Sequence, residues 1–256
     1  MNELRNRISE LENKYYELFS VKATDGQIVR YSDDELKDMY DHNFTLISAS
    51  SSKETIDEII QGEKAKRKEA GYNFLKIKFD AQVAEEKIPA DDLARLTDLE
   101  YYSLTRTAVH QLKEREDIEV IKLSDVLVDE ARELDELCEP DESLDFTNRR
   151  FDRRLKVYLG DAPLNSYLAM QEWVVVGSCD YFAADGACML EDFVVDPEVR
   201  NQGIGTTLLK SLANRAFAEH NDLVFLTTEA IGSAKEMYQK LGFEKILVKT
   251  EALYRF

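Results

Sequence analysis

Apolar residues recur at two spacings along this chain of 256 residues, and each change of spacing marks a change of element. Near the N-terminus an apolar residue recurs every three or four positions, the spacing of one helix face: Leu4, Ile8, Leu11, Tyr15 and Leu18. This stripe covers too few heptads to indicate a coiled coil. We therefore expect the helix to dock on its own domain rather than to form a dimer.

Helix and strand patterns alternate through the rest of the N-terminal half. A helical pattern from Ser52 ends at Gly71, and residues 74–79 alternate between apolar and polar as in a strand. We also expect a strand at 27–32, a helix opening at the cap residue Ser32, a helix starting at Pro89-Ala90-Asp91-Asp92, and a strand at 101–109. This mixture predicts an α/β fold for the half.

A charged run, HQLKERED at 110–117, separates these elements from a second series. We place a domain boundary there, between a smaller N-terminal α/β domain at 1–116 and a C-terminal domain at 117–256. Asp185-Gly186 predicts a tight hairpin turn in the second domain. That domain's pattern predicts strands at 118–123, 166–170, 173–182, 188–195, 223–228 and 244–256, and helices at 124–138, 143–158, 203–219 and 233–243.

One stretch of the second domain, LEDFVVDPEVRNQGIGTTLL at 190–209, runs from a strand to two glycines and a helix start. This order is typical of an anion site, because glycines let the backbone approach a phosphate and a helix N-terminus directs N–H groups at it. A P-loop would need Lys directly after the second glycine, but two threonines follow Gly205. A dinucleotide fingerprint would need Gly or Ala where Leu208 stands.

The pattern that remains, Arg200-x-x-Gly203-x-Gly205, resembles the R/Q-x-x-G-x-G/A turn of the GCN5-related N-acetyltransferase (GNAT) superfamily. The segments VVDPEVRNQGIGTTLL, AKEMYQKLGF and WVVVGSCDYF are similar to that family's strand end and helix start, its later helix, and its preceding hairpin strand. The resemblance covers roughly residues 118–256, with the elements in the same order. It implies a mixed, strongly twisted sheet with helices on both faces, and acetyl-CoA as cosubstrate without a metal.

The resemblance also implies where acetyl-CoA binds. In the family this turn holds the pyrophosphate, and we expect backbone groups of the strand end to contribute. Asn201-Gln202 replace the family's common basic or glycine pair, and Ile231 stands where the family often has a cofactor-contacting Asn. The expected cofactor-binding residues are Phe193, Val194, Val195, Arg200, Asn201, Gln202, Gly203, Ile204, Gly205 and Thr206.

Acetyl transfer by direct attack needs a neutral amine, a proton acceptor and an acid near the departing thiolate, but no protein nucleophile. Many family members use the tyrosine at the position of Tyr238 as this acid, so the resemblance implies the same role here. The alternative is a packing role, in which Tyr238 borders a buried stripe of Ala234, Met237 and Leu241.

Glu191 is the expected base or amine ligand, because the family's small-amine acetyltransferases have a Glu at this place in the strand. Strand alternation would put Phe193 and Val195 on the same face as Glu191, and Asp192 on the opposite face. Only one of the two carboxylates would then face the substrate side. The alternative for each is a solvated or locally paired charge.

Together these features predict an N-acetyltransferase acting on a primary amine of a small molecule or peptide. The alternative is a non-catalytic acyl-CoA-binding or interaction module that retains the fold. Residues 55–79 share a helix-then-strand plan with 206–228, so the N-terminal half is either a degenerate GNAT-like copy or an ordinary α/β arrangement. We expect it to lack a cofactor site and to help shape the acceptor site or a dimer contact. Monomer and homodimer are both open.

The net charge is −18, of which −12 falls in residues 117–256. The acidic balance argues against nucleic acid as a partner and favours steering of a cationic amine acceptor. No apolar run approaches the roughly 20 residues of a membrane span. The N-terminus lacks a signal-peptide pattern, and three cysteines in no framework suit reduced thiols in the cytoplasm. The arginines at 149, 150, 153 and 154 are expected to form a solvated helix face.

Overall fold

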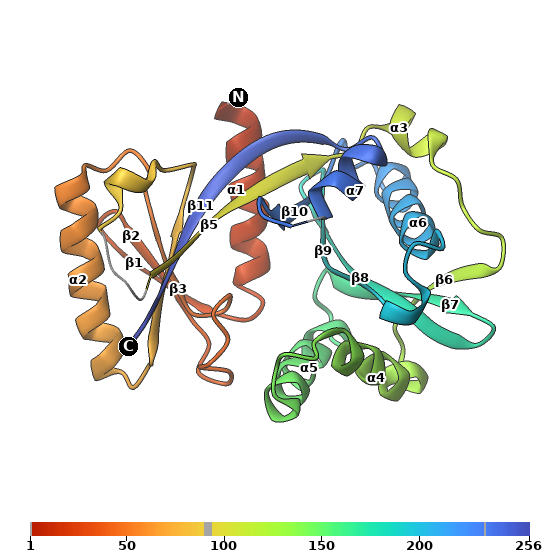
Figure 1. Cartoon of the computed structure of the whole chain (residues 1–256), viewed down its shortest axis with the longest axis horizontal. Helices are drawn as coiled ribbons and strands as arrows, with labels where there is room; N and C mark the ends of the chain where they lie inside the picture. The colour runs from red at the N-terminus through yellow and green to blue at the C-terminus, as the bar shows by residue number, and fades with distance from the viewer. Residues whose placement is uncertain (1, 90–93, 233) are drawn as a thin grey trace. The chain divides into compact units, whose positions relative to one another are not determined.

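The computed structural model describes residues 2–89, 94–232 and 234–256 (Figure 1). The chain divides into two compact units. The large unit comprises the residues up to Tyr15, Tyr102–Thr227 and Glu236–Lys245, and the small unit comprises Tyr16–Tyr101, Thr228–Lys235 and Ile246–Phe256. This division differs from the single boundary predicted at residues 116 and 117. The reason is that β5 (Ala94–Ser103) and β11 (Glu244–Arg255) each have residues in both units.

The large unit contains a mixed sheet with the strand order β5-β10-β9-β8-β7-β6. The antiparallel strands are β6 (Ile118–Lys122), β7 (Leu164–Gln171), β8 (Val174–Ala184) and β9 (Ala187–Val195). The predicted hairpin turn joins β8 to β9, with φ of 51° at Asp185 and 78° at Gly186, both positive as this turn type requires. β10 (Leu223–Glu229) then returns parallel to β9.

Helices cover both faces of this sheet. α4 (Val128–Cys138) and α5 (Leu144–Tyr158) lie on one face, and α6 (Ile204–Ala218) lies on the other (Figure 1). The Ser143 hydroxyl accepts a hydrogen bond from the Phe146 N–H and so caps α5 at the predicted start. The short α7 (Ala234–Lys240) follows β10, and Gly242 ends it with a φ of 85°. The predicted elements of the C-terminal half are therefore confirmed.

The N-terminal helix α1 (Asn2–Tyr16) contributes its residues up to Tyr15 to the large unit. Ile8 and Leu11 are buried, as the apolar stripe predicts. Arg7 pairs with Asp222, just before β10, and Lys14 pairs with Asp185 in the β8–β9 turn. The helix therefore docks within the chain, but on the large unit rather than on the N-terminal half.

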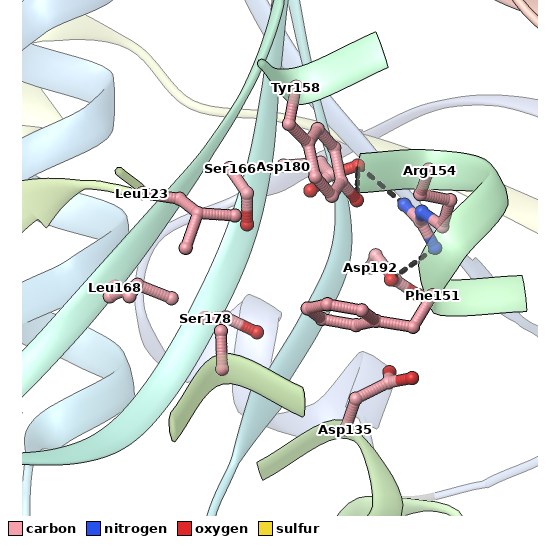
Figure 2. Close-up of a pocket in the computed structure, with 11 residues that line it drawn as sticks. Leu123, Asp135, Phe151, Arg154, Tyr158, Ser166, Leu168, Ser178, Asp180 and Asp192 are labelled. Carbon is pink, nitrogen blue, oxygen red and sulfur yellow. Dashed lines mark hydrogen bonds and ion pairs between the residues drawn. The ribbon is translucent and has the colours of Figure 1, made fainter. Parts of the chain in front are cut away.

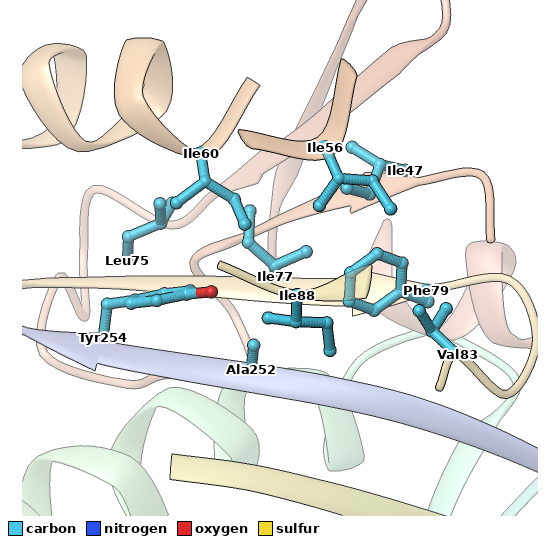
Figure 3. Close-up of a cluster of buried hydrophobic side chains, with 10 residues drawn as sticks. All are labelled: Ile47, Ile56, Ile60, Leu75, Ile77, Phe79, Val83, Ile88, Ala252 and Tyr254. Carbon is cyan, nitrogen blue, oxygen red and sulfur yellow. The ribbon is translucent and has the colours of Figure 1, made fainter. Parts of the chain in front are cut away.

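The small unit has the strand order β1-β2-β3-β4-β11-β5. The bounds are β1 Val21–Asp25, β2 Ile28–Ser32, β3 Phe44–Ile47 and β4 Phe74–Phe79, with α2 at Lys53–Glu69 and a 3-10 turn at Glu85–Lys87. β3 and β4 are parallel and α2 joins them, so β3-α2-β4 repeats the plan of β9-α6-β10. Figure 3 shows the core between α2 and the sheet: Ile47, Ile56, Ile60, Leu75, Ile77, Phe79, Val83, Ile88, Ala252 and Tyr254.

Two predictions for the N-terminal half are wrong. Residues after Ser32 form turns rather than a helix, because the Asn43 side chain binds the backbone: its amide donates to the Leu36 and Met39 carbonyls, each at 2.9 Å. The strand expected over 101–109 ends at Ser103, since Thr105 caps the short helix α3 (Arg106–Gln111). The helix predicted to start at Pro89-Ala90-Asp91-Asp92 falls on 90–93, outside the described residues.

β4 is a strand as predicted, but all of its side chains are buried instead of every second one. The polar positions Lys76 and Lys78 are accommodated by ion pairs with Glu251 on β11, at 2.8 Å and 3.2 Å. Asp41 pairs with both lysines as well. Pairing replaces the water that these ammonium groups lose on burial.

None of the helices in the described ranges is long and apolar enough to cross a membrane.

Candidate functional site

β9 and β10 pair along only part of their length. Their parallel register runs from Ala187 opposite Leu223 to Leu190 opposite Leu226, and the described residues show no pairing beyond it. β9 meanwhile stays paired with β8 up to Val195. The register between β8 and β9 shifts at Cys179, and Asp192 has a φ of 50°, as at a β-bulge. The two central strands therefore part beside Phe193, Val194 and Val195, as a ligand between them would require.

The predicted glycine turn follows directly. Asp196 accepts a hydrogen bond from the Glu198 N–H at 2.9 Å and starts a 3-10 turn at Pro197–Val199. Asn201 and Gly203 then take positive φ angles of 62° and 86°. Gly203 is the N-cap of α6 and offers no side chain to the first N–H groups of the helix. Those donors remain suited to an anionic ligand.

Gly205 has a packing reason of its own. A Cβ at this position would lie 2.7 Å from Cζ of Phe193 and 3.3 Å from Cγ2 of Val195. The missing side chain lets α6 approach β9 closely. The second glycine of the motif is therefore required by the fold as well as by the expected ligand.

Two cations lie at the turn. Arg200 is exposed, and its Nε donates to the Val195 carbonyl oxygen at 2.9 Å, which ties the turn to the end of β9. Arg115, from the charged run before β6, donates from Nη1 to the Gln202 carbonyl oxygen at 3.1 Å. Arg115 is not among the predicted cofactor-binding residues, because nothing in the motif indicates which distant segment crosses the turn.

Tyr238 on α7 is 6% exposed, and its ring lies near those of Tyr102 and Phe243, at centroid distances of 6.2 Å and 5.5 Å. The expected stripe is wrong: Met237 is 37% exposed, so the buried residue of this turn is Tyr238 itself. Burial raises the pKa of the Tyr238 phenol well above its usual range, and the negative charge of Glu191 raises it further. The phenol therefore keeps its proton at neutral pH and lies within electrostatic reach of Glu191.

Glu191 is half-buried and lies directly opposite Asp180 on β8. Residues directly opposite each other point to the same face of a sheet, and Asp180 bonds to Arg154 on α5. Glu191 therefore shares the α5 face, and so does Asp192, which also pairs with Arg154. The predicted separation of these two carboxylates is wrong, because the bulge at Asp192 interrupts the alternation of the strand.

Figure 2 shows the pocket on this face, which is lined by residues of α4, α5 and the strands of the sheet. Asp180 accepts a hydrogen bond from the Tyr158 hydroxyl at 2.9 Å, and burial raises its pKa to about 6 although Arg154 opposes the shift. Two buried side-chain atoms of the residues that line the pocket, Nε of Arg154 and Oδ2 of Asp135, have no hydrogen-bond partner in the described part of the chain. The pocket is lined by Leu123, Ala131, Asp135, Phe151, Arg154, Tyr158, Ser166, Leu168, Ser178, Asp180 and Asp192.

The solvated arginine face expected on α5 is wrong for two of its members. Arg150 and Arg154 are both buried, and Arg150 pairs with Asp135 at 2.8 Å. The two arginines are four residues apart, so they lie on one face of α5, and their burial shows that this face is turned away from solvent. The pocket itself is lined by three carboxylates, of Asp135, Asp180 and Asp192, and by the guanidinium of Arg154.

The three cysteines are free thiols. Cys179 and Cys188 are buried, and burial raises the pKa of Cys138 to about 11, so all three are protonated thiols at neutral pH. The part of the chain that the structure describes contains no group of three or more His, Cys, Asp or Glu able to hold a metal ion.

The corresponding place in the small unit is closed. β3 pairs with β4 up to its last residue, Ile47 opposite Phe79, and the Asp80 N–H then donates to the Ile47 carbonyl oxygen. The Asp80 carboxylate accepts from the Ala49 N–H at 2.7 Å and from the Ser48 hydroxyl at 3.1 Å. The Asp80 carboxylate thus accepts the hydrogen bond of the backbone N–H that follows β3, and β3 and β4 stay paired to their ends.

The sequence profile of the Acetyltransferase (GNAT) family matches residues 106–243, which is more than half of the chain. The chain belongs to this family. The predicted fold class, a mixed sheet with helices on both faces, is confirmed by solved structures of similar fold.

A conserved protein of unknown function from Staphylococcus epidermidis has a TM-score of 0.75 and 18% identity, covering 92% of this chain and 94% of its own. A GCN5-related N-acetyltransferase from Kribbella flavida has a TM-score of 0.68 and 14% identity, covering 97% and 94%. No curated protein matches the chain. At these identities the solved structures show the fold, and both cover the N-terminal half as well.

Proposed function

We propose that the protein is an acetyl-CoA-dependent N-acetyltransferase that acts on a primary amine of a small molecule or peptide. The observation that carries this proposal is the parting of β9 from β10 directly beside the uncapped N-terminus of α6. The parted strands offer backbone groups to an extended chain, and the helix N-terminus offers N–H donors to its phosphates. The three free cysteines support a reducing compartment such as the cytoplasm.

The residues present fit acetyl-CoA. The first N–H groups of α6 have no side-chain cap, Arg200 and Arg115 add positive charge, and Gly203 and Gly205 keep the turn narrow. We assign the pantetheine arm to the backbone of Phe193, Val194 and Val195. The pyrophosphate is assigned to the turn at Arg200, Asn201, Gln202, Gly203, Ile204, Gly205 and Thr206. When bound, acetyl-CoA supplies the thioester carbonyl that the amine attacks.

Tyr238 is assigned as the acid. Its phenol is buried and protonated at neutral pH, and no hydrogen bond within the described ranges contributes to its pKa shift. A protonated phenol can donate a hydrogen bond to the sulfur of the leaving group, where negative charge develops. Desolvation around the ring strengthens that interaction.

Glu191 is assigned as the group that receives the amine proton, directly or through water. It lies opposite Asp180, and Asp180 and Asp192 both pair with Arg154, so three carboxylates share a face on which the pairs involve one buried guanidinium. This excess of negative charge favours an acceptor that arrives as a cation and is deprotonated in the site.

A screen over polyamines, aminoglycosides, amino acids and peptides tests the proposal, with acetyl-CoA consumption and acetylated product measured together. We expect turnover with at least one cationic amine, and a rate at limiting substrate that falls as salt rises. A screen that returned only anionic or neutral acceptors would contradict the cationic assignment.

The second candidate is a non-catalytic acyl-CoA-binding module. Ile231, which stands where the family often has a cofactor-contacting Asn, is 84% exposed and offers no polar group to a cofactor. Tight CoA binding without turnover on any amine of the panel would favour this second function.

A further inference from the structure

The segment before β6 is fastened to the first turns of α6. The Arg115 N–H donates to the Thr207 hydroxyl at 3.0 Å, and that hydroxyl donates to the Gly203 carbonyl oxygen at 3.0 Å. Glu114 pairs with Lys210 one turn further along the helix, at 3.4 Å. The backbone of Arg115 is therefore fixed beside the glycine turn by contacts that do not involve its guanidinium.

The side chain of Arg115 crosses the turn. Its Cδ lies 3.6 Å from the point where a Gly203 Cβ would be, and its Nη1 donates to the Gln202 carbonyl oxygen. Asp117 accepts from Nε at 2.9 Å and also from Nη2, so one edge of the guanidinium is held by a carboxylate. Asp117 is itself held by the Gln171 amide at 3.0 Å. The guanidinium is thus oriented before any ligand arrives.

A guanidinium has five N–H donors, and these three bonds use three of them. The other two belong to Nη1 and Nη2, on a side chain that is 27% exposed. A planar pair of donors with fixed orientation matches the geometry of a phosphate. The first turn of α6 begins at Ile204, directly after Gly203, and has no side-chain cap. Its free N–H groups also favour an anion.

We propose that Arg115 binds a phosphate group of CoA and is the second cation of the cofactor site, with Asp117 as its positioning residue. This inference rests on the proposed function and adds a residue from outside the glycine motif. Arg200, the first cation, also ties the turn to β9, because its Nε donates to the Val195 carbonyl oxygen.

The alternative is that Arg115 only supports the turn through packing. Arg115→Met keeps most of the aliphatic stem and removes the charge. If Arg115 contacts a phosphate, the Kd of the full-length variant for CoA should rise about tenfold in low salt. The difference should shrink strongly in 1 M salt, where the screening length is about 3 Å. If Arg115 only supports the turn, the variant should lose the same amount of CoA affinity in low salt and in 1 M salt.

Calorimetry with CoA and with 3′-dephospho-CoA forms the experiment. If Arg115→Met lowers the affinity for both ligands, Arg115 contacts the pyrophosphate. If it lowers the affinity for CoA alone, Arg115 contacts the 3′-phosphate. Asp117→Asn should weaken binding less, because the charge remains while its orientation is relaxed. Arg132→Met is the matched control, since Arg132 pairs with Asp152 at 2.6 Å between α4 and α5 and should leave affinity unchanged.

Melting temperatures identify any variant that fails to fold, and Arg115→Lys then provides a milder test of the same contact. Unchanged affinity of a folded Arg115→Met protein, or a loss that salt does not alter, would overturn the inference and leave the proposed function standing. Failure of the wild-type protein to bind CoA would instead contradict the proposed function.

Discussion

Phe193 on β9 occupies the space that a side chain at position 205 would need. A Cβ on Gly205 would lie 2.7 Å from Cζ of Phe193, closer than real Cβ contacts come. The contact joins the strand end to the start of α6. Both segments belong to the expected cofactor site, so the packing of this pair fixes the position of one segment relative to the other.

Gly205→Ala should therefore destabilise the protein by about 1–3 kcal/mol, the usual cost of overpacking a core. Urea unfolding measures the change. Phe193→Leu should restore part of the loss in the double variant, because it removes the atoms in conflict. Gly62→Ala on α2 is the control: a Cβ there meets nothing within 4 Å, so added helix propensity should stabilise the protein slightly. If Gly205→Ala and Gly62→Ala changed the free energy of unfolding equally, the proposed conflict between residue 205 and Phe193 would be refuted.

Tyr238→Phe should lower turnover by roughly 10²-fold or more, the range expected for loss of a general acid. The ring and its packing remain, so CoA affinity and melting temperature should change little. Tyr102→Phe, which removes a hydroxyl from a neighbouring ring, is the matched control and should retain near wild-type turnover. If Tyr238 is only packing, Tyr238→Phe will keep wild-type turnover and Tyr238→Ala will merely unfold more easily. The comparison requires that chemistry, and not product release, limits the rate.

Asp180 should make stability depend on pH in a particular direction. Its pKa is about 6 in the folded protein, above the ordinary value of 3.8 that it regains on unfolding. Between these values the folded state binds more protons than the unfolded state, so this group makes stability fall as pH rises toward and through 6. Asp180→Asn removes the proton exchange. The free energy of unfolding of the wild type relative to this variant should drop as pH rises from about 4 to about 6, and a difference that stays constant or rises would contradict the raised pKa.

The full chain should bind one CoA, not two. In the small unit, Asp80 takes the N–H of Ala49 and the hydroxyl of Ser48 at the end of β3, where a phosphate would need donors. The strands there remain paired to their ends. Calorimetric stoichiometry decides the matter, and a value near two per chain would show that the small unit retains a site.

Much of the large unit could be predicted from sequence, because its signals are local. Asp185-Gly186 marks a turn that needs positive φ, Ser143 caps a helix, and the glycine turn carries its own conformational constraints. The fold class followed from a motif whose residues lie close together in the chain.

The errors have non-local causes. Glu191 and Asp192 share a face because of a bulge that only pairing with β8 reveals. Arg154 is buried because carboxylates from two strands meet it, and Arg115 reaches the glycine turn from a segment far away in sequence. Around Ser32 a helical pattern yielded to hydrogen bonds from Asn43, eleven positions on. Periodicity contains no information about such partners.

Calorimetric titration of CoA into the wild-type protein and its Gly203→Val variant tests the central claim most directly. Valine disfavours the φ of 86° at this position by about 1–2 kcal/mol, so the turn should relax and its N–H groups should lose their direction. Gly71→Val is the matched control. Gly71 has a φ of 82° in the small unit, so a valine there would be strained in the same way but away from the site. We predict that Gly203→Val raises the Kd for CoA at least tenfold while Gly71→Val leaves it unchanged. Unaltered CoA affinity in a folded Gly203→Val protein would place the cofactor elsewhere and contradict the account.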